Sequence, residues 1–372
     1  MFVYLDNSST TKQFSEVSKY MYDIMENHFG NPSSMHKLGI DTEKIIKNAR
    51  KQVADKLGVN SEEVYFTSGG TESDNTAIFG SAYSKKRQGN KIITTKVEHP
   101  AVLEAMKKLE SEGFEVVYLP VDENCKVSVE DYKNAVDDKT IFTSVMTVNN
   151  EVGTIQPIAQ LYKAKPKQSI FHTDGVQAFC KTDIPKVDLI SLSGHKIHGP
   201  KGIGALYVKR GMTIKPFLVG GGQEKHFRSG TENVPAIAGL GMAAEMNKDN
   251  GNMAEVKKYL LEGIKAEIKD IKINTPEDSV DSVLNISFLG TRSEVILHTL
   301  EMDDIYVSAG SACSSNKKGR SHVLEAMGLK DAEIEGAIRF SFNRFNTIEE
   351  MDYCLDKLKN AVNRFRKLGS FR

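Results

Sequence analysis

Residues 187–196 read VDLISLSGHK, an apolar run that ends in a short polar turn with a lysine. The apolar and β-branched residues of this run are typical of a buried strand. Lys196 therefore follows a strand directly, at the point where the ends of neighbouring strands converge. Most lysines are solvated surface charges, and for Lys196 taken alone this interpretation stays open. The alternative is a lysine that forms a Schiff base with a carbonyl compound, and the rest of the sequence decides between the two.

Composition limits the class of protein. The chain has 372 residues, 40% of them hydrophobic, and its 49 basic side chains balance 49 acidic ones. This length is enough for one large domain and a smaller one. The balanced charge does not favour nucleic acid or an anionic membrane as a partner. No apolar run is long enough to span a bilayer, and the N-terminus lacks a signal-peptide pattern, so we expect a cytoplasmic protein.

Short apolar runs alternate with helical patterns along the first 210 residues. In the helical stretches 44–57 and 99–110, apolar side chains recur on one helix face. Such alternation predicts an α/β fold in which helices flank a mostly parallel, seven-stranded sheet. The predicted strands are 64–67, 91–95, 115–121, 141–148, 169–173, 187–193 and 204–210.

A second, smaller part of the chain follows the polar stretch NKDNGN. We expect a large domain at 13–255 and a small α+β domain made of 1–12 and 256–372. The final helix begins where Thr347 and Glu350 have the spacing of a capping box.

Four cysteines, Cys125, Cys180, Cys313 and Cys354, lie far apart and form no CxxC pair. Their spacing predicts neither a zinc site nor a disulfide framework, and we expect no metal. Cys354 falls on the apolar stripe of the final helix, which indicates a core position. Cys313 lies in SAGSACSSNKKG, where small and polar neighbours indicate access to the thiol.

The turn SGGT follows the predicted strand 64–67 and opens a helix. In parallel sheets, ligands bind beyond the carboxyl ends of the strands. Gly69 and Gly70 let the backbone approach a ligand, and Thr71 adds a hydroxyl beside free helix N–H groups. This turn fits a phosphate and equally fits an ordinary glycine turn with a threonine cap.

Four further strand ends carry polar side chains. They are His99 before Pro100, the amide Asn150, the pair Asp174 and Gln177, and the group Ser193, His195 and Lys196. Each has an ordinary structural interpretation, such as a helix cap. Together they match the needs of pyridoxal phosphate (PLP), which are a lysine, an anion site for its phosphate and a carboxylate for its ring nitrogen. The imidazole of His99 could stack on the ring.

The chain resembles the cysteine desulfurases, in the class V aminotransferase-like branch of the fold-type I PLP enzymes. The resemblance extends from the opening YLDNSSTT to the final helix and implies the PLP-dependent transferase fold type I. The matching segments are FTSGGTESDN, VEHPAV, NNEVGTIQPI, HTDGVQA, SGHKIHGPKGIGALYV, GGGQEKHFRSGTENV, SAGSACSS and AIRFSFNRFNT. The SAC segment separates desulfurases from transaminating relatives.

The resemblance implies a role at the cofactor for each matching position. Lys196 is similar to the Schiff-base lysine, and His99 to the histidine that stacks on the pyridine ring and shares in proton transfer. Asp174 would pair with the ring nitrogen, Gln177 would contact the ring oxygen, and Asn150 would lie at the cofactor and the substrate. The residues implied at the phosphate are Gly70, Thr71, Ser193, His195 and, from the partner subunit of a homodimer, Thr231.

Two further positions would act on the substrate, L-cysteine. Arg339 resembles the arginine that binds the substrate carboxylate, a task that suits its bidentate fork, although a strand-end surface charge is the ordinary alternative. Cys313 resembles the nucleophile that takes the sulfur as a persulfide and leaves alanine. The alternatives within enzymes are a class V aminotransferase or a selenocysteine lyase. An alternative of another class is a sulfur carrier or regulatory scaffold that kept the fold without turnover.

The sequence departs from the family pattern at three places, and from one of them, Ser8 and Ser9 in the opening motif, nothing is inferred. Gly70 replaces the common alanine of the phosphate turn. The chain also ends at NRFRKLGSFR, just after the final helix, where relatives that supply iron–sulfur scaffolds often have a further tail. We therefore expect the sulfur acceptor to be a dedicated protein, such as a tRNA-thiolating enzyme, rather than an iron–sulfur scaffold.

Overall fold

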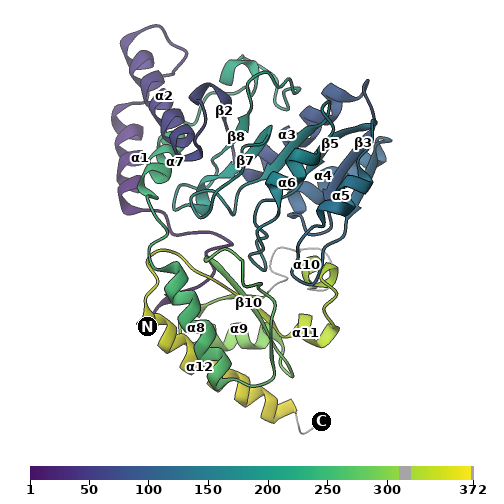
Figure 1. Ribbon diagram of the computed structural model, residues 1–372. Coiled ribbons are helices and arrows are strands. Elements are labelled where there is room, and N and C mark those ends of the chain that lie inside the picture. The colour runs from purple at the N-terminus through teal and green to yellow at the C-terminus, as the bar shows by residue number, and fades with distance from the viewer. Residues whose placement is uncertain (310–319, 370–372) are drawn as a thin grey trace.

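A seven-stranded sheet forms the centre of the larger part of the molecule (Figure 1). The computed structural model describes residues 1–309 and 320–369, and within them the strand order is β2-β8-β7-β6-β5-β3-β4. All neighbouring strands are parallel except β8, which runs antiparallel to β2 and β7. The strands are β2 (Val64–Thr67), β3 (Lys91–Thr95), β4 (Glu115–Leu119), β5 (Thr140–Ser144), β6 (Ile170–Asp174), β7 (Leu189–Ser193) and β8 (Gly204–Val208). Each predicted run forms one strand, so the predicted mostly parallel sheet is confirmed.

Helices cover both faces of this sheet because its strands are apolar on both sides. In β7, Ile190 and Leu192 belong to the core beneath one face, whereas Leu189 belongs to the core beneath the other. The helices of the first face are α1 (Ser15–Asn27), α2 (Lys37–Leu57), α5 (Val129–Ala135), α6 (Ile158–Ala164) and α7 (Val234–Met246). Those of the second face are α3 (Gly70–Lys85) and α4 (Pro100–Ser111).

The smaller part has an antiparallel sheet of order β12-β13-β10-β9 with helices packed on it. Its strands are β9 (Ile271–Ile273), β10 (Val283–Phe288), β12 (Ser308–Ala309) and β13 (Ala337–Ser341). Its helices are α8 (Met253–Glu267), α9 (Ser293–Glu301), α10 (His322–Ala326), α11 (Asp331–Glu335) and α12 (Ile348–Gly369). The predicted capping box is confirmed, since the Glu350 N–H donates to Thr347 Oγ1 at 3.3 Å and the Thr347 N–H donates to Glu350 Oε2 at 3.1 Å.

The N-terminal segment joins this smaller part. β1 (Val3–Tyr4) pairs in parallel with β11 (Ile305–Tyr306), and Val3 and Leu5 are fully buried in the core that α8 and α12 share. We propose a large domain that begins near residue 13 and a small domain made of the first twelve residues and the C-terminal part. Because Met253 already belongs to the small core, we place the boundary in the loop before α8. None of the helices in the described ranges is long and apolar enough to cross a bilayer.

Candidate active site

A cavity of about 330 Å³ lies at the carboxyl ends of the parallel strands. Volumes near this are usual for sites that bind small molecules. Nine of the predicted site residues line the cavity, namely Gly70, Thr71, His99, Asn150, Asp174, Gln177, Ser193, His195 and Lys196. They meet because β2, β3, β5, β6 and β7 all end at this edge, while β8 starts there. A Cβ on Gly204, the first residue of β8, would lie 2.8 Å from the Cα of Gly69, so this approach needs a glycine.

The Lys196 amine lies against the N-terminal segment. Lys196 ends a 3-10 turn (Gly194–Lys196) that follows β7. Its Nζ donates to the carbonyl oxygens of Ser8 at 2.5 Å and Ser9 at 2.8 Å. Two carbonyl acceptors hold the amine at the cavity wall, which suits a group that must meet an electrophile bound there.

The N-terminus of α3 lies at one end of the cavity, where Gly70 and Thr71 line it. The helix begins at Gly70 and has 16 residues, so its first N–H groups and its dipole favour an anion. A Cβ at Gly70 would approach Val176 Cγ2 to 2.9 Å. The Val176 side chain therefore fills the space that an alanine would need, which explains the glycine at this position.

Asp174 supplies a buried carboxylate at the end of β6. Its Oδ1 accepts from the Val176 N–H at 2.9 Å. Burial raises the pKa of Asp174 to about 6, against the opposing effect of Lys196. Behind it, Asp74 has an Oδ1 that is buried without a hydrogen-bond partner and lies 3.6 Å from His172 Nε2. A cation against Asp174, such as a protonated ring nitrogen, would be paired with a buried negative charge.

His99 caps α4 and is held as a neutral imidazole. Its Nδ1 accepts from the Ala101 N–H at 3.1 Å, so in the neutral ring the proton resides on Nε2. Burial, assisted by the charges of Lys196 and His322, lowers the pKa of His99 to about 4. The ring therefore stays uncharged at neutral pH and can stack on a flat ligand. The predicted N-cap position of His99 is confirmed.

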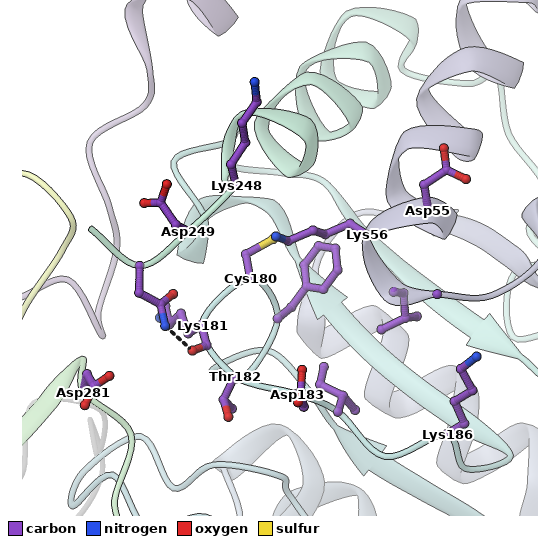
Figure 2. A pocket seen from close by; sticks show the side chains of 15 residues that line it. Asp55, Lys56, Cys180, Lys181, Thr182, Asp183, Lys186, Lys248, Asp249 and Asp281 are labelled. Atoms are coloured by element: carbon purple, nitrogen blue, oxygen red, sulfur yellow. Dashed lines mark hydrogen bonds between the residues drawn. The ribbon is translucent and has the colours of Figure 1, made fainter. Parts of the chain in front are cut away.

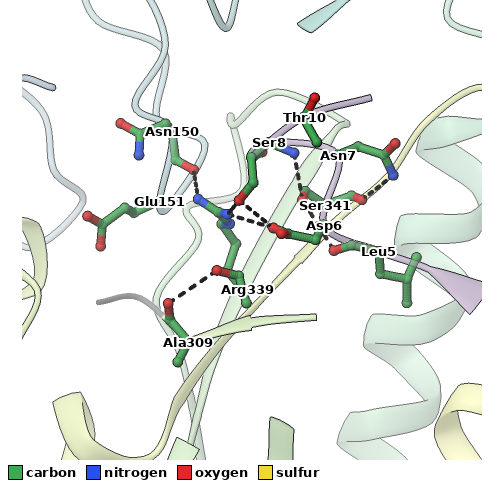
Figure 3. Close-up of polar contacts among 12 residues, drawn as sticks. Leu5, Asp6, Asn7, Ser8, Thr10, Asn150, Glu151, Ala309, Arg339 and Ser341 are labelled. Carbon is green, nitrogen blue, oxygen red and sulfur yellow. Dashed lines mark hydrogen bonds and ion pairs between the residues drawn. The ribbon is translucent and has the colours of Figure 1, made fainter. Parts of the chain in front are cut away.

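Arg339 lies behind the cavity wall in β13, almost fully buried (Figure 3). Its Nη1 donates to the Asn150 carbonyl at 3.0 Å, and its Nη2 donates to Asp6 Oδ1 and to Ser9 Oγ, each at 2.8 Å. Its Nε is buried and has no partner. Since Asn150 and Ser9 line the cavity, this cation borders it and retains one unused donor.

Among the predicted site residues that the structure describes, Arg339 and Thr231 do not line this cavity. Thr231 is exposed on the surface and does not line the cavity. Cys313 lies outside the described residues. Within 1–309 and 320–369, no group of three or more histidine, cysteine, aspartate or glutamate side chains is arranged to hold a metal ion.

Several residues that line the cavity or support it were not predicted from the sequence. Ser8 and Ser9 contact Lys196, Asp6 pairs with Arg339, and Asp74 lies beside the acid Asp174 in the lining. The signal in the sequence that could have indicated Asp6, Ser8 and Ser9 is the polar run DNSSTT, which follows the apolar residues of β1. Its position against Lys196 depends on the tertiary fold.

Comparison with known proteins gives a consistent family. Residues 3–354 match the family model described as aminotransferase class-V. The cysteine desulfurase IscS of Clostridium botulinum is 44% identical over 380 residues, which cover 99% of this chain and 96% of that protein. A solved NifS-like protein superposes with a TM-score of 0.92 at 38% identity, covering 98% of this chain and all of the other. The structure described as SspA in complex with cysteine has a TM-score of 0.83 at 34% identity, covering 93% of this chain and all of the other.

Proposed function

This chain belongs to the class V aminotransferase family and is a cysteine desulfurase, and from that premise we propose which of its residues carry the reaction. The observation that supports the proposal most strongly is the meeting of Lys196, Asp174 and the N-terminus of α3 in one cavity of about 330 Å³. The family implies PLP, which, when bound, supplies the electron sink for the reaction of an amino acid.

The residues present fit this cofactor. Lys196 would hold it covalently, and the helix start at Gly70 and Thr71 would bind its phosphate together with Ser193 and His195. The buried Asp174 would face the ring nitrogen, and the neutral His99 ring would stack on the pyridine. Gln177 and Asn150 would contact the ring oxygen and the substrate side. This set offers an amine, an anion site and a buried carboxylate. In addition, Asp74 Oδ1 in the cavity lining is buried and has no hydrogen-bond partner in the protein.

The chain's own groups would then move one proton and hold one carboxylate. The Lys196 amine, steadied by the Ser8 and Ser9 carbonyls, would remove the α-proton of L-cysteine. The guanidinium of Arg339 would bind the substrate carboxylate. Its unpartnered Nε supports this role, and the carboxylate would compete with Asp6 for the Nη2 edge.

The sulfur would pass to Cys313 and then to an acceptor protein. Cys313 attacks as the thiolate, which leaves a persulfide on the enzyme and releases alanine. Its segment joins the described chain at Arg320 and Ser321, and the Ser321 hydroxyl donates to the buried Glu151 carboxylate. This contact joins Ser321 to the residue that follows Asn150 in the chain. The acceptor we propose is a dedicated protein such as a tRNA-thiolating enzyme, and an iron–sulfur scaffold is the alternative.

The experiment that tests the proposed function combines the cofactor and the product. The purified protein should be yellow after loading with PLP, should form alanine from L-cysteine, and should gain the mass of one sulfur atom on the peptide with Cys313. Aminotransferase activity would instead require an added keto acid and would leave the protein mass unchanged. A protein that binds no PLP, or that binds it and yields no alanine, would contradict the proposal.

We also propose that the protein is a homodimer with shared sites. Thr231 is exposed in the single chain, although the resemblance assigns it to the phosphate. Large exposed apolar side chains gather on α1, on the start of α2 and between them, where a partner subunit would cover them. They are Tyr22, Met25, Phe29, Met35, Leu38 and Ile40.

Mixing Lys196→Ala chains with Thr231→Ala chains should restore activity above that of either variant alone. Each mixed dimer would have one site with both residues intact if Thr231 acts across the dimer. With random exchange, about a quarter of all sites would be intact, which sets the expected recovery of alanine formation. Thr231 acting within its own chain would give no recovery, provided that mass spectrometry shows subunit exchange.

A further inference from the structure

Lys181 is a lysine that the proposed reaction does not use, and it lies directly behind the cofactor cavity. It belongs to a run of turns after β6, in which the Phe179 N–H donates to the Gly175 carbonyl and the Lys181 N–H to the Ala178 carbonyl. Residues four positions apart in such helical turns face the same side. Lys181 therefore lies over Gln177, which lines the cavity.

The side chain of Gln177 lies between a hydrogen-bond donor, the Lys181 ammonium group, and a hydrogen-bond acceptor, the Ser8 carbonyl. Lys181 Nζ donates to Gln177 Oε1 at 3.1 Å, and Gln177 Nε2 donates to the Ser8 carbonyl at 2.9 Å. An amide can rotate by half a turn and exchange its oxygen and nitrogen, but an ammonium group has no acceptor and a carbonyl has no donor. These two neighbours together permit only one orientation, with the NH₂ toward Ser8 and the cavity.

The ammonium group is costly to keep in this place. Burial lowers the pKa of Lys181 to about 7, and the positive charges of Lys196 and Arg339 act in the same direction, while Cys180 opposes them. Among the residues that the structure describes, no carboxylate lies within ion-pair distance of Lys181, although Asp183 and Asp249 line the same outer cavity. Partial burial of an amine without an acid partner costs folding free energy, whatever the amine does in the reaction.

On its far side Lys181 borders a second cavity of about 740 Å³ (Figure 2). Figure 2 shows Cys180 and Lys56 together in the wall of this cavity, with Lys186 and Lys248 at its edge. The Asn250 side chain donates to the Lys181 carbonyl at 2.7 Å, which fixes the backbone of this turn to the segment before α8. The Lys181 side chain is thus held between the outer cavity and Gln177.

We propose that Lys181 is a positioning residue that acts through Gln177. In its protonated form the Lys181 head group is donor-only and locks the Gln177 amide with its NH₂ toward Ser8. The Ser8 carbonyl accepts hydrogen bonds from both this NH₂ and the Lys196 amine. Lys181 thereby couples the orientation of Gln177 to the segment that holds the cofactor-binding lysine. This inference rests on the proposed function, since it assumes that the cavity binds PLP.

The test is a double-mutant cycle on PLP affinity, measured by equilibrium titration of the apoprotein. Lys181→Met keeps the length of the side chain and removes the donor, so we expect PLP to bind about tenfold more weakly. In the Gln177→Leu background the same change should alter the affinity by less than about twofold, because the amide is no longer there to be oriented. Lys181→Arg retains a donor-only head group and should stay within about threefold of the parent.

The control is Lys186→Met, which removes an exposed lysine from the same outer cavity and should leave PLP affinity unchanged. The absorption spectrum of the bound cofactor is a second readout, which should change in Lys181→Met and return in Lys181→Arg. Equal effects of Lys181→Met in both backgrounds, or no effect in the parent, would overturn the inference. A parent protein that binds no PLP would instead overturn the proposed function itself.

Discussion

Lys196→Ala should lower the rate of alanine formation by a factor on the order of a thousand or more. A loss of this size is expected when a side chain that takes part directly in the reaction is removed. The amine has two tasks, which are to hold the cofactor and to take the α-proton. Among the described residues that line the cavity, no other side chain carries an amine. Borohydride treatment of the PLP-loaded parent should leave the cofactor attached to the peptide that contains SGHK. The variant should show no such attachment by mass spectrometry.

A matched control for this variant is Lys201→Ala. Lys201 is an exposed lysine in the same loop, five positions farther along, and it does not line the cavity. Its removal should leave alanine formation and cofactor attachment close to those of the parent. Substantial desulfurase activity in Lys196→Ala, or attachment of the cofactor to a different lysine, would disprove the assignment.

Cys313→Ser should bind PLP and L-cysteine like the parent but form no persulfide and almost no alanine. The thiolate is the nucleophile, and a serine hydroxyl at neutral pH is far weaker. The measurements are alanine release and the mass of the protein after incubation with L-cysteine. An added sulfur atom in the variant, or alanine release at the parent rate, would contradict the role of Cys313.

The other cysteines are poor candidates for this role on physical grounds. Burial raises the pKa of Cys180 and of Cys354 to about 12, and it raises the pKa of Cys125 further still. At pH 8 a thiol with a pKa of about 12 is ionised in only about one molecule in 10⁴. Cys125→Ala, Cys180→Ala and Cys354→Ala should therefore keep most of the parent activity, so long as melting temperatures show that each variant is folded.

The strands were predictable because apolar, β-branched runs report burial on both faces of a parallel sheet. The same signal misplaced some strand ends. The apolar run after Thr140 continues to Val148, yet β5 ends at Ser144. Met146 and Val148 lie beyond the end of β5 and line the cavity, and Val148 also forms an isolated bridge with Ile155. Periodicity reports burial, and only the structure shows what each buried residue faces.

The candidate site was predictable where its residues directly follow strands. His99, Asp174 and Lys196 needed no knowledge of distant segments, because the carboxyl ends of parallel strands lie at one edge. Thr231 and Arg339 were named by resemblance alone, and so was the nucleophilic role of Cys313, although its small and polar neighbours had indicated an accessible thiol. The present structure leaves Thr231 exposed on the surface, and Cys313 lies outside the described residues.

By itself, the sequence determined the parallel sheet, the edge at which a ligand binds and the chemical set of amine, carboxylate and helix N-terminus. These features are local, since the residues that determine each of them lie within a few positions of a strand end. The tertiary structure alone decided that the carbonyls of Ser8 and Ser9 meet the Lys196 amine, across 188 and 187 residues, and that Asp6 meets Arg339 across 333. Such contacts arise because the N-terminal segment packs on the small domain. No local pattern of polarity in the sequence predicts which distant donor will form a hydrogen bond with a given backbone carbonyl.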